Sequence, residues 1–169
     1  MAYIGLISDT HGVFDEPLKQ FLAPVDEIWH AGDFGGGFTT AAEIARFKPL
    51  VGVSGNCDNY DLRYDYPLHR FFTCGGMKVL MTHIGGYPGK YDRNAYSLIM
   101  HYSPDIFVCG HSHILKVVYD KYFNMMVLNP GAAGFQGFHI VRTALRFHID
   151  DGKISGMEVL NLDKIQAEK

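Results

Sequence analysis

Five short apolar segments of this chain each end in a turn that carries an aspartate, an asparagine or a histidine. Four to eight apolar residues bounded by turn residues are typical of a buried β-strand. In open α/β sheets, ligands bind in the crevice at the carboxyl ends of the strands. We therefore expect an α/β protein in which these polar strand ends gather at one location. The five turns are SDTHG at 8–12, GDFGGG at 32–37, GNCD at 55–58, THIGG at 82–86 and GHSH at 110–113.

The first part of the chain alternates between predicted strands and predicted helices. Both predicted helices show helix signals at their ends, a proline near the start of one and two threonines at the start of the other. A β-α-β-α-β order implies parallel strands with helices packed on the sheet. The predicted strands are YIGLIS at 3–8, DEIWHAG at 26–32 and LVGVS at 50–54, and the helices are DEPLKQFLA at 15–23 and TTAAEIARF at 39–47.

The second part of the chain is richer in predicted strands. Three hairpins are expected, turning at Gly75-Gly76, around Lys121 and at Asp151-Gly152. Between the first two lie a predicted helix, YDRNAYSLIMHY at 91–102, and a predicted strand, DIFVCG at 105–110. Because no linker, repeat or low-complexity segment divides the chain, residues 1–169 are expected to form a single domain with two mixed sheets.

Composition excludes several classes of function. A net charge of -3 gives no electrostatic reason to expect a nucleic-acid or membrane-surface partner. No apolar run approaches the ~20 residues of a membrane span, and the N-terminus lacks a secretory signal. The three cysteines contain no CxxC pair, which favours a reducing cytoplasm over a disulfide framework.

The polar residues of the five turns are candidate metal ligands. Seven oxygen and nitrogen donors are too many for one tetrahedral zinc ion but suit two divalent ions, with Mn²⁺ expected and Fe²⁺, Ni²⁺, Co²⁺ or Zn²⁺ as alternatives. Two such ions about 3.5–4 Å apart can clamp an in-line phosphoryl displacement and activate a shared water as the nucleophile. Asp33 is the natural bridging carboxylate. The seven candidates are Asp9, His11, Asp33, Asn56, His83, His111 and His113.

The motifs DTHG, HAGD, GNCD, MTHIGG and GHSH, in this order over positions 9–113, resemble those of the calcineurin-like metallophosphoesterases. The likeness is greatest to the small single-domain bacterial and archaeal members often described as phosphodiesterases. It implies a four-layer α/β/β/α sandwich. It also implies one ion held by Asp9, His11, Asp33 and His113, and a second held by Asp33, Asn56, His83 and His111, with Ser112 as the spacer in GHSH.

The resemblance implies hydrolysis of a small phosphorylated substrate, most simply a phosphodiester, by a metal-bridging hydroxide. Asp33 and Asn56 are the expected catalytic residues, together with Asp58 as an acceptor that orients a histidine or a loop amide. Many family members carry a histidine where this chain has Cys57, and that histidine protonates the leaving group. A neutral thiol is a weak donor, so the enzyme should be slower on poor leaving groups.

The sequence motifs say less about the roles of Cys57, two arginines and the remaining histidines. Cys57, Arg63 and Arg93 are candidate substrate-binding residues, although either arginine could equally be a solvated loop charge. His30 is expected to be packed and hydrogen-bonded. The remaining histidines, at positions 69, 101, 139 and 148, are expected on the surface or on sheet faces.

Two other functions stay open. One is a non-catalytic interaction scaffold, since the retromer complex contains a subunit of this fold whose site lacks the full catalytic set. The other is a phosphatase acting on nucleotides or phosphomonoesters. Small members of the family often pair, so a homo-oligomer is compatible with the resemblance.

Overall fold

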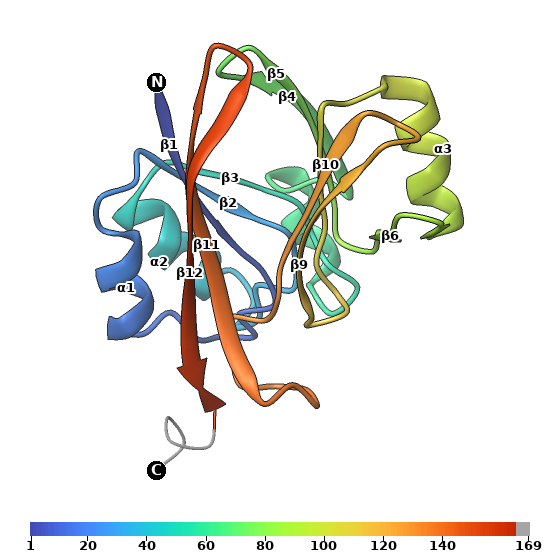
Figure 1. Ribbon diagram of the computed structural model, residues 1–169. Helices are drawn as coiled ribbons and strands as arrows, with labels where there is room; N and C mark the ends of the chain where they lie inside the picture. Colours follow the sequence, from blue (N-terminus) through green and yellow to red (C-terminus); the bar gives the residue numbers. More distant parts are fainter. Residues whose placement is uncertain (165–169) are drawn as a thin grey trace.

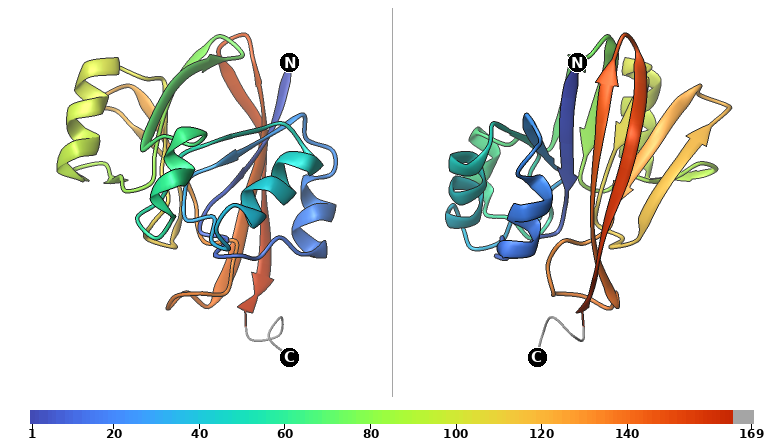
Figure 2. Two further views of the ribbon diagram at one scale, coloured as in Figure 1. Left: turned by 180° about the vertical axis from the view of Figure 1, so that it is seen from behind. Right: turned by 60° about the vertical axis from the view of Figure 1, so that its left-hand side comes forward.

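The computed structural model describes residues 1–164 as two five-stranded β-sheets that pack face to face between helices (Figure 1). Helices α1 (Glu16–Leu22) and α2 (Thr39–Phe47) lie on one outer side, and α3 (Arg93–Tyr102) lies on the opposite side, as Figure 2 also shows. The predicted four-layer α/β/β/α sandwich of two mixed sheets is therefore confirmed.

The first sheet combines a parallel N-terminal part with an antiparallel C-terminal hairpin. The three N-terminal strands pair in parallel, as the β-α-β-α-β order predicts, and the first of them pairs antiparallel with a C-terminal strand. In spatial order the strands are β12 (Lys153–Asp163), β11 (Val141–Asp150), β1 (Ala2–Ile7), β2 (Glu27–His30) and β3 (Leu50–Gly52).

The second sheet contains the other two predicted hairpins. Its three inner strands are parallel, and both edge strands run antiparallel to their neighbours. In spatial order the strands are β4 (His69–Cys74), β5 (Met77–Thr82), β8 (Ile106–Val108), β10 (Met125–Pro130) and β9 (Leu115–Asp120).

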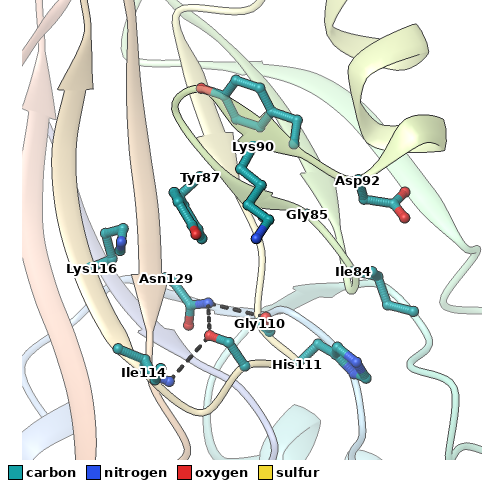
Figure 3. A pocket seen from close by; sticks show the side chains of 13 residues that line it. Ile84, Gly85, Tyr87, Lys90, Asp92, Gly110, His111, Ile114, Lys116 and Asn129 are labelled. Carbon is teal, nitrogen blue, oxygen red and sulfur yellow. Dashed lines mark hydrogen bonds between the residues drawn. The ribbon is translucent and has the colours of Figure 1, made fainter.

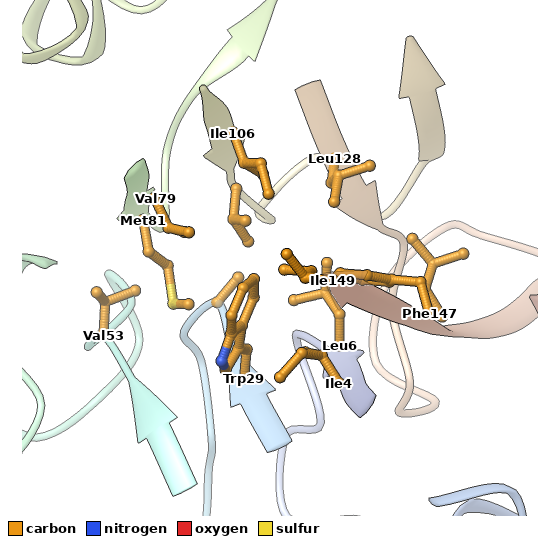
Figure 4. Packing of buried hydrophobic residues seen from close by; sticks show 13 residues of the cluster. Ile4, Leu6, Trp29, Val53, Val79, Met81, Ile106, Leu128, Phe147 and Ile149 are labelled. Atoms are coloured by element: carbon orange, nitrogen blue, oxygen red, sulfur yellow. The ribbon is translucent and has the colours of Figure 1, made fainter. Parts of the chain in front are cut away.

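The main hydrophobic core lies between the two sheets (Figure 4). Trp29 from β2 meets Phe147 from β11 edge-on at 5.9 Å between ring centres, and both side chains are fully buried. Separate apolar clusters attach the helices to the outer faces, with Leu18 and Ile44 on the first sheet and Ile99 on the second. Burial of a side chain of this size stabilises the fold by roughly 1.5–3 kcal/mol, so the three clusters fix the sheets and with them the strand ends.

Two short elements follow no pattern that the sequence displays. A 3₁₀ helix, η1 (Tyr60–Tyr64), lies in the loop after β3, and a two-stranded hairpin of β6 (Gly86–Tyr87) and β7 (Lys90–Tyr91) follows β5. Strands of two residues are too short to show alternation. None of the helices within residues 1–164 has the length and apolar character needed to cross a lipid bilayer.

Candidate metal centre

The five turns predicted to converge do so at the carboxyl ends of β1, β2, β3, β5 and β8. Backbone hydrogen bonds join them directly: the Asp9 amide donates to the Gly32 carbonyl at 2.9 Å. The Gly110 amide donates to the His83 carbonyl, also at 2.9 Å, within the second sheet. Across the two sheets, the His111 amide donates to Oδ2 of Asp9 at 3.1 Å. Both sheets therefore contribute to one site.

Two buried aspartates and three histidines form the centre of this site. Oδ1 of Asp9 lies 3.1 Å from Nε2 of His113 and 3.8 Å from Nε2 of His11. Oδ2 of Asp33 lies 3.1 Å from Nε2 of His83 and 3.7 Å from Nε2 of His11. Oδ1 of Asp9 also lies 3.9 Å from Nε2 of His83. Two donor sets thus meet at the aspartates, Asp9 with His11 and His113, and Asp9 with Asp33 and His83.

His83 is oriented as a metal ligand. Its Nδ1 lies 2.7 Å from the carbonyl oxygen of Ala31, which only accepts, so Nδ1 carries the proton and donates it. In the neutral ring this leaves Nε2 with a free lone pair. Nε2 is buried and has no hydrogen-bond partner within residues 1–164. A buried polar atom without a partner is costly, and a cation at this position would satisfy it.

Asn56 and His111 complete the predicted set at the exposed side of the cluster. Oδ1 of Asn56 lies 3.1 Å from Nδ1 of His111, and the His111 ring lies edge-on to His83 at 5.2 Å between centres. Both Asn56 and His111 are exposed, in contrast to the buried aspartates. All seven predicted ligands therefore lie in or beside one cluster, and their donor types fit divalent ions.

Five of the seven predicted ligands have left-handed backbone conformations. Non-glycine residues rarely adopt positive φ, and each instance costs of order 1–3 kcal/mol. Such strain is maintained only where the surrounding structure fixes it, and it concentrates at functional sites. The φ angles are 52° at Asp9, 44° at His11, 59° at Asp33, 69° at His111 and 62° at His113.

Two glycines let the backbone approach the aspartates closely. A Cβ atom on Gly55 would overlap Oδ1 and the amide nitrogen of Asp33, and a Cβ on Gly110 would overlap the hydroxyl of Ser8. Neither site has room for a side chain, so the glycines of GNCD and GHSH are required by packing against the ligands.

The electrostatics of the cluster keep its carboxylates ionised. Burial alone would raise the pKa of Asp33, but neighbouring His83, the Cys57 amide and His11 lower it to about 2. Burial also opposes ionisation of Asp9, whose pKa is nevertheless lowered by His113, His83 and the Ser8 hydroxyl. Burial disfavours charge on His83 as well, yet the two aspartates and the Ala31 carbonyl raise its pKa. The centre is thus a negative pocket in which cations are favoured.

Asp58 holds the backbone around the cluster. Its Oδ2 accepts hydrogen bonds from the amides of Asp33 at 2.9 Å and Gly55 at 2.8 Å, and its Oδ1 accepts from the Gly35 amide at 3.2 Å. It therefore binds loop amides, one of the two arrangements expected for it. The amide of Cys57 donates to Oδ1 of Asp33 at 2.8 Å, while the residue itself is exposed.

Three contributors to the site were not identified from the sequence. The Ser8 hydroxyl donates to Oδ2 of Asp9 at 2.6 Å. Nδ2 of Asn129 donates to the Gly110 carbonyl at 3.0 Å and to the hydroxyl of Ser112 at 3.1 Å, which fixes the GHSH turn (Figure 3). His139, expected on the surface or a sheet face, lies edge-on to His113 at 5.0 Å between ring centres. The partners of Asn129 and His139 are distant in sequence, so no local motif signals those two contacts.

Three further residues considered in the sequence, His30, Arg63 and Arg93, lie outside the set of predicted ligands. His30 is fully buried, stacks on Phe34 and bonds Thr10 through Nε2 at 2.9 Å, which confirms its packed role. The guanidinium of Arg63 lies over the Tyr60 ring at 4.7 Å. Arg93 is exposed at the first position of α3. Within residues 1–164, neither arginine forms a hydrogen bond or an ion pair with the seven predicted ligands, and their role in substrate binding stays a prediction.

Comparisons with solved structures show the same fold in several small proteins. Vps29 from Entamoeba histolytica, solved in complex with Zn²⁺, is 18% identical with a TM-score of 0.70, over 96% of this chain and 99% of that chain. An archaeal phosphodiesterase is 18% identical with a TM-score of 0.70, over 95% and 99%. A predicted phosphoesterase from Streptococcus pneumoniae is 22% identical with a TM-score of 0.64, over 97% and 90%. At these identities the likeness shows the fold alone.

The family follows from the sequence of the whole domain. A search of curated proteins gave no significant match. The family model described as the calcineurin-like phosphoesterase superfamily domain matches residues 3–152, which include all five turns. The members of this family depend on metal ions, and the Asp and His groups here could bind them. The chain belongs to the calcineurin-like phosphoesterase superfamily.

Proposed function

We propose that this protein is a metal-dependent phosphodiesterase that binds two divalent ions, with Mn²⁺ as the expected metal. One observation carries the proposal: two ionised, buried aspartates face three imidazole Nε2 atoms, one of which, on His83, is buried without a hydrogen-bond partner among residues 1–164. Imidazole nitrogens and ionised carboxylates that converge in a buried site are the ligand types that divalent metal ions bind.

The residues divide between holding the ions and facing the substrate. Asp9, His11, Asp33 and His113 would hold one ion, and Asp33, Asn56, His83 and His111 the other. Oδ2 of Asp33 lies between His11 and His83, which supports its proposed bridging position. When bound, two divalent ions supply Lewis acidity to the phosphate and lower the pKa of water toward neutrality.

The chain's own groups position the substrate around that centre. Asn56 and His111 are the exposed members of the set, so the phosphate would approach from their side. The Asn56 side-chain amide can donate to a non-bridging phosphate oxygen, while Asp58 keeps the Asp33 and Gly55 amides in place. The exposed Cys57 lies next to Asn56, at the position where a leaving group would need a proton.

Metal reconstitution tests this proposal. The protein is treated with a chelator, reloaded with Mn²⁺ or another divalent ion, and assayed on bis(4-nitrophenyl) phosphate and on 4-nitrophenyl phosphate. We expect turnover only after reloading, with the diester preferred. His113→Ala should abolish turnover, whereas His101→Ala, at the exposed end of α3, is the matched control and should retain it. Equal turnover with and without metal would refute the mechanism.

A non-catalytic scaffold is the second candidate, because several vacuolar sorting proteins share this fold, with TM-scores of 0.67 to 0.72. The same experiment separates the two. A scaffold would bind metal, measured by calorimetry, and hydrolyse neither compound with any ion. The three cysteines are all free, which supports a reducing, cytoplasmic setting for either function.

A further inference from the structure

A cavity of about 410 Å³ opens directly beside the candidate metal centre (Figure 3). The β6–β7 hairpin forms one wall, the GHSH turn forms another, and residues of β9 and β10 close it. His111, a predicted ligand, lines this cavity, so a substrate at the metal centre would extend into it. The volume lies in the range of small-molecule sites, about 300–1,000 Å³.

Two lysines from different elements face this cavity. Lys90 comes from β7 and Lys116 from β9, and Figure 3 shows the Lys90 ammonium directed toward the middle of the cavity. Nζ of Lys116 lies 4.1 Å from the centre of the Tyr87 ring. Within residues 1–164, neither ammonium group lies within ion-pair distance of a carboxylate.

The acidic side chain that lines this cavity is already engaged. Asp92 also lines the cavity, but its Oδ2 accepts hydrogen bonds from the amides of Asn94 at 3.0 Å and Ala95 at 3.1 Å as the N-cap of α3. Two unpaired cations beside a negative metal centre, in a chain of net charge -3, form a local positive site. Such a site favours an anionic group.

The remaining wall of the cavity is apolar. Ile84 and Ile114 directly follow the predicted ligands His83 and His113 in sequence, and both are exposed, as is Tyr87. An apolar lining with a few convergent polar groups is typical of a small-molecule site. The apolar side chains of the cavity would therefore contact the carbon-rich part of a ligand, and the two lysines would contact its anionic group.

We propose that this cavity binds one ester arm of the substrate and that this arm carries a second phosphate group, as in a 5′-phosphorylated dinucleotide. The inference rests on the proposed phosphodiesterase function and specifies its substrate class. In the reaction, the oxygen of water joins phosphorus and the bond from phosphorus to one ester oxygen breaks. That oxygen takes up a proton from the water, so that a phosphomonoester and an alcohol result. Lys90 and Lys116 neutralise the second phosphate, which takes no part in bond breaking.

Two dinucleotides that differ only in the terminal phosphate test this proposal. We expect kcat/KM of the Mn²⁺-loaded protein to be about tenfold higher for 5′-phosphorylated thymidylyl-thymidine than for thymidylyl-thymidine, from the added charge–charge attraction. The double variant Lys90→Ala/Lys116→Ala should lose this preference and keep its activity on bis(4-nitrophenyl) phosphate. Lys121→Ala, in the exposed β9–β10 turn, is the matched control and should keep the preference. A wild-type protein without preference, or a double variant that retains it, would overturn the inference.

A binding measurement separates failure of this inference from failure of the proposed function. Calorimetry of the chelator-treated protein should detect thymidine 5′-monophosphate but not thymidine, with affinity reduced about tenfold in the double variant and unchanged in Lys121→Ala. If no diester is hydrolysed while this binding pattern holds, the cavity is an anion site and the phosphodiesterase proposal fails. If diesters are hydrolysed while the nucleotide binds both proteins equally, the cavity assignment fails.

Discussion

Nε2 of His83 lies 3.1 Å from Oδ2 of Asp33, and that buried nitrogen makes no hydrogen bond within residues 1–164. The opposite ring nitrogen donates to the Ala31 carbonyl, so the ring is fixed with Nε2 directed at an ionised carboxylate. Neutral imidazole beside carboxylate is the arrangement that a divalent ion requires of its ligands. This pair therefore connects the folding of β2 and β5 to metal binding.

Asp33→Asn should abolish hydrolysis of an aryl phosphodiester while leaving the fold intact. The amide keeps the size of the side chain but removes the charge that faces His11 and His83. Mutation of a residue that only orients a metal ligand typically lowers metal affinity or activity by about 10–100-fold. Loss of a ligand itself should therefore lower both by more than about 100-fold. Bound metal and turnover are measured on the same sample, with exposed Asp61→Asn as the matched control. Wild-type turnover of Asp33→Asn in excess Mn²⁺ would contradict the mechanism.

Metal binding should release more protons at low pH than at high pH. The pKa of His83 is raised above its ordinary value, chiefly by the aspartates against the opposing effect of burial, so the metal-free ring is protonated to higher pH than a free histidine. A metal ion needs the unprotonated Nε2, so binding displaces that proton, and affinity rises with pH until the raised pKa is passed. Calorimetry of Mn²⁺ binding in buffers of different ionisation enthalpy counts the protons. The same count at pH 6 and pH 9 would contradict this role for His83.

Sequence patterns were sufficient for the sheets and for the ends of the strands that form the site. Apolar segments and turn residues are local signals, so β1 to β3 and the three hairpins were predicted at nearly their observed positions. The assignment of individual ligands came from the family resemblance, because a contact such as that of Asp9 with His113 joins residues 104 positions apart.

The remaining features depend on tertiary structure that no local pattern encodes. Positive φ at Asp9 or His11 results from the way the turns pack on one another, and the side chain of Asn129 reaches the GHSH turn only once β10 lies beside β8. Arg63 and Arg93 were singled out in the flanking loops, whereas the cations that line the cavity beside His111 are Lys90 and Lys116.

Asp58→Asn should reduce activity without removing a predicted ligand. Asp58 accepts three backbone amides, and the substituted side chain would present an NH₂ group to at least one of these donors. We expect activity or metal affinity to fall about 10–100-fold, as for other residues that orient ligands. The unsatisfied amide should also lower the free energy of unfolding by about 1–3 kcal/mol. Chemical denaturation and metal titration measure the two effects, and unchanged values in both would show that Asp58 does not hold the turn.

His30 should make the metal-free protein less stable as the pH falls from about 6.5 toward 3. Complete burial, opposed by the charge of Asp9, lowers the pKa of His30 to about 3, whereas the unfolded chain binds this proton near 6.5. The unfolded state therefore holds more protons in that window, so stability increases with pH across it. His30→Gln should flatten the pH dependence of the free energy of unfolding, while exposed His101→Gln should leave it unchanged. Parallel curves for wild type and His30→Gln would contradict this assignment.

Cys57→His should raise activity on phosphomonoesters. Burial and the neighbouring Asp33 and Asp58 raise the pKa of the Cys57 thiol, so the wild-type side chain is neutral and a poor proton donor. An imidazole at this exposed position can carry a positive charge and protonate the leaving alcohol, a contribution that is typically 10²–10⁴-fold where geometry allows. The measurement is kcat/KM on 4-nitrophenyl phosphate and on an alkyl phosphate, for which leaving-group protonation matters more. Cys57→Ser, which adds a hydroxyl but no charge, is the matched control. No gain or a loss in Cys57→His, relative to wild type, would show that the thiol has a role of its own beyond occupying the position of a histidine.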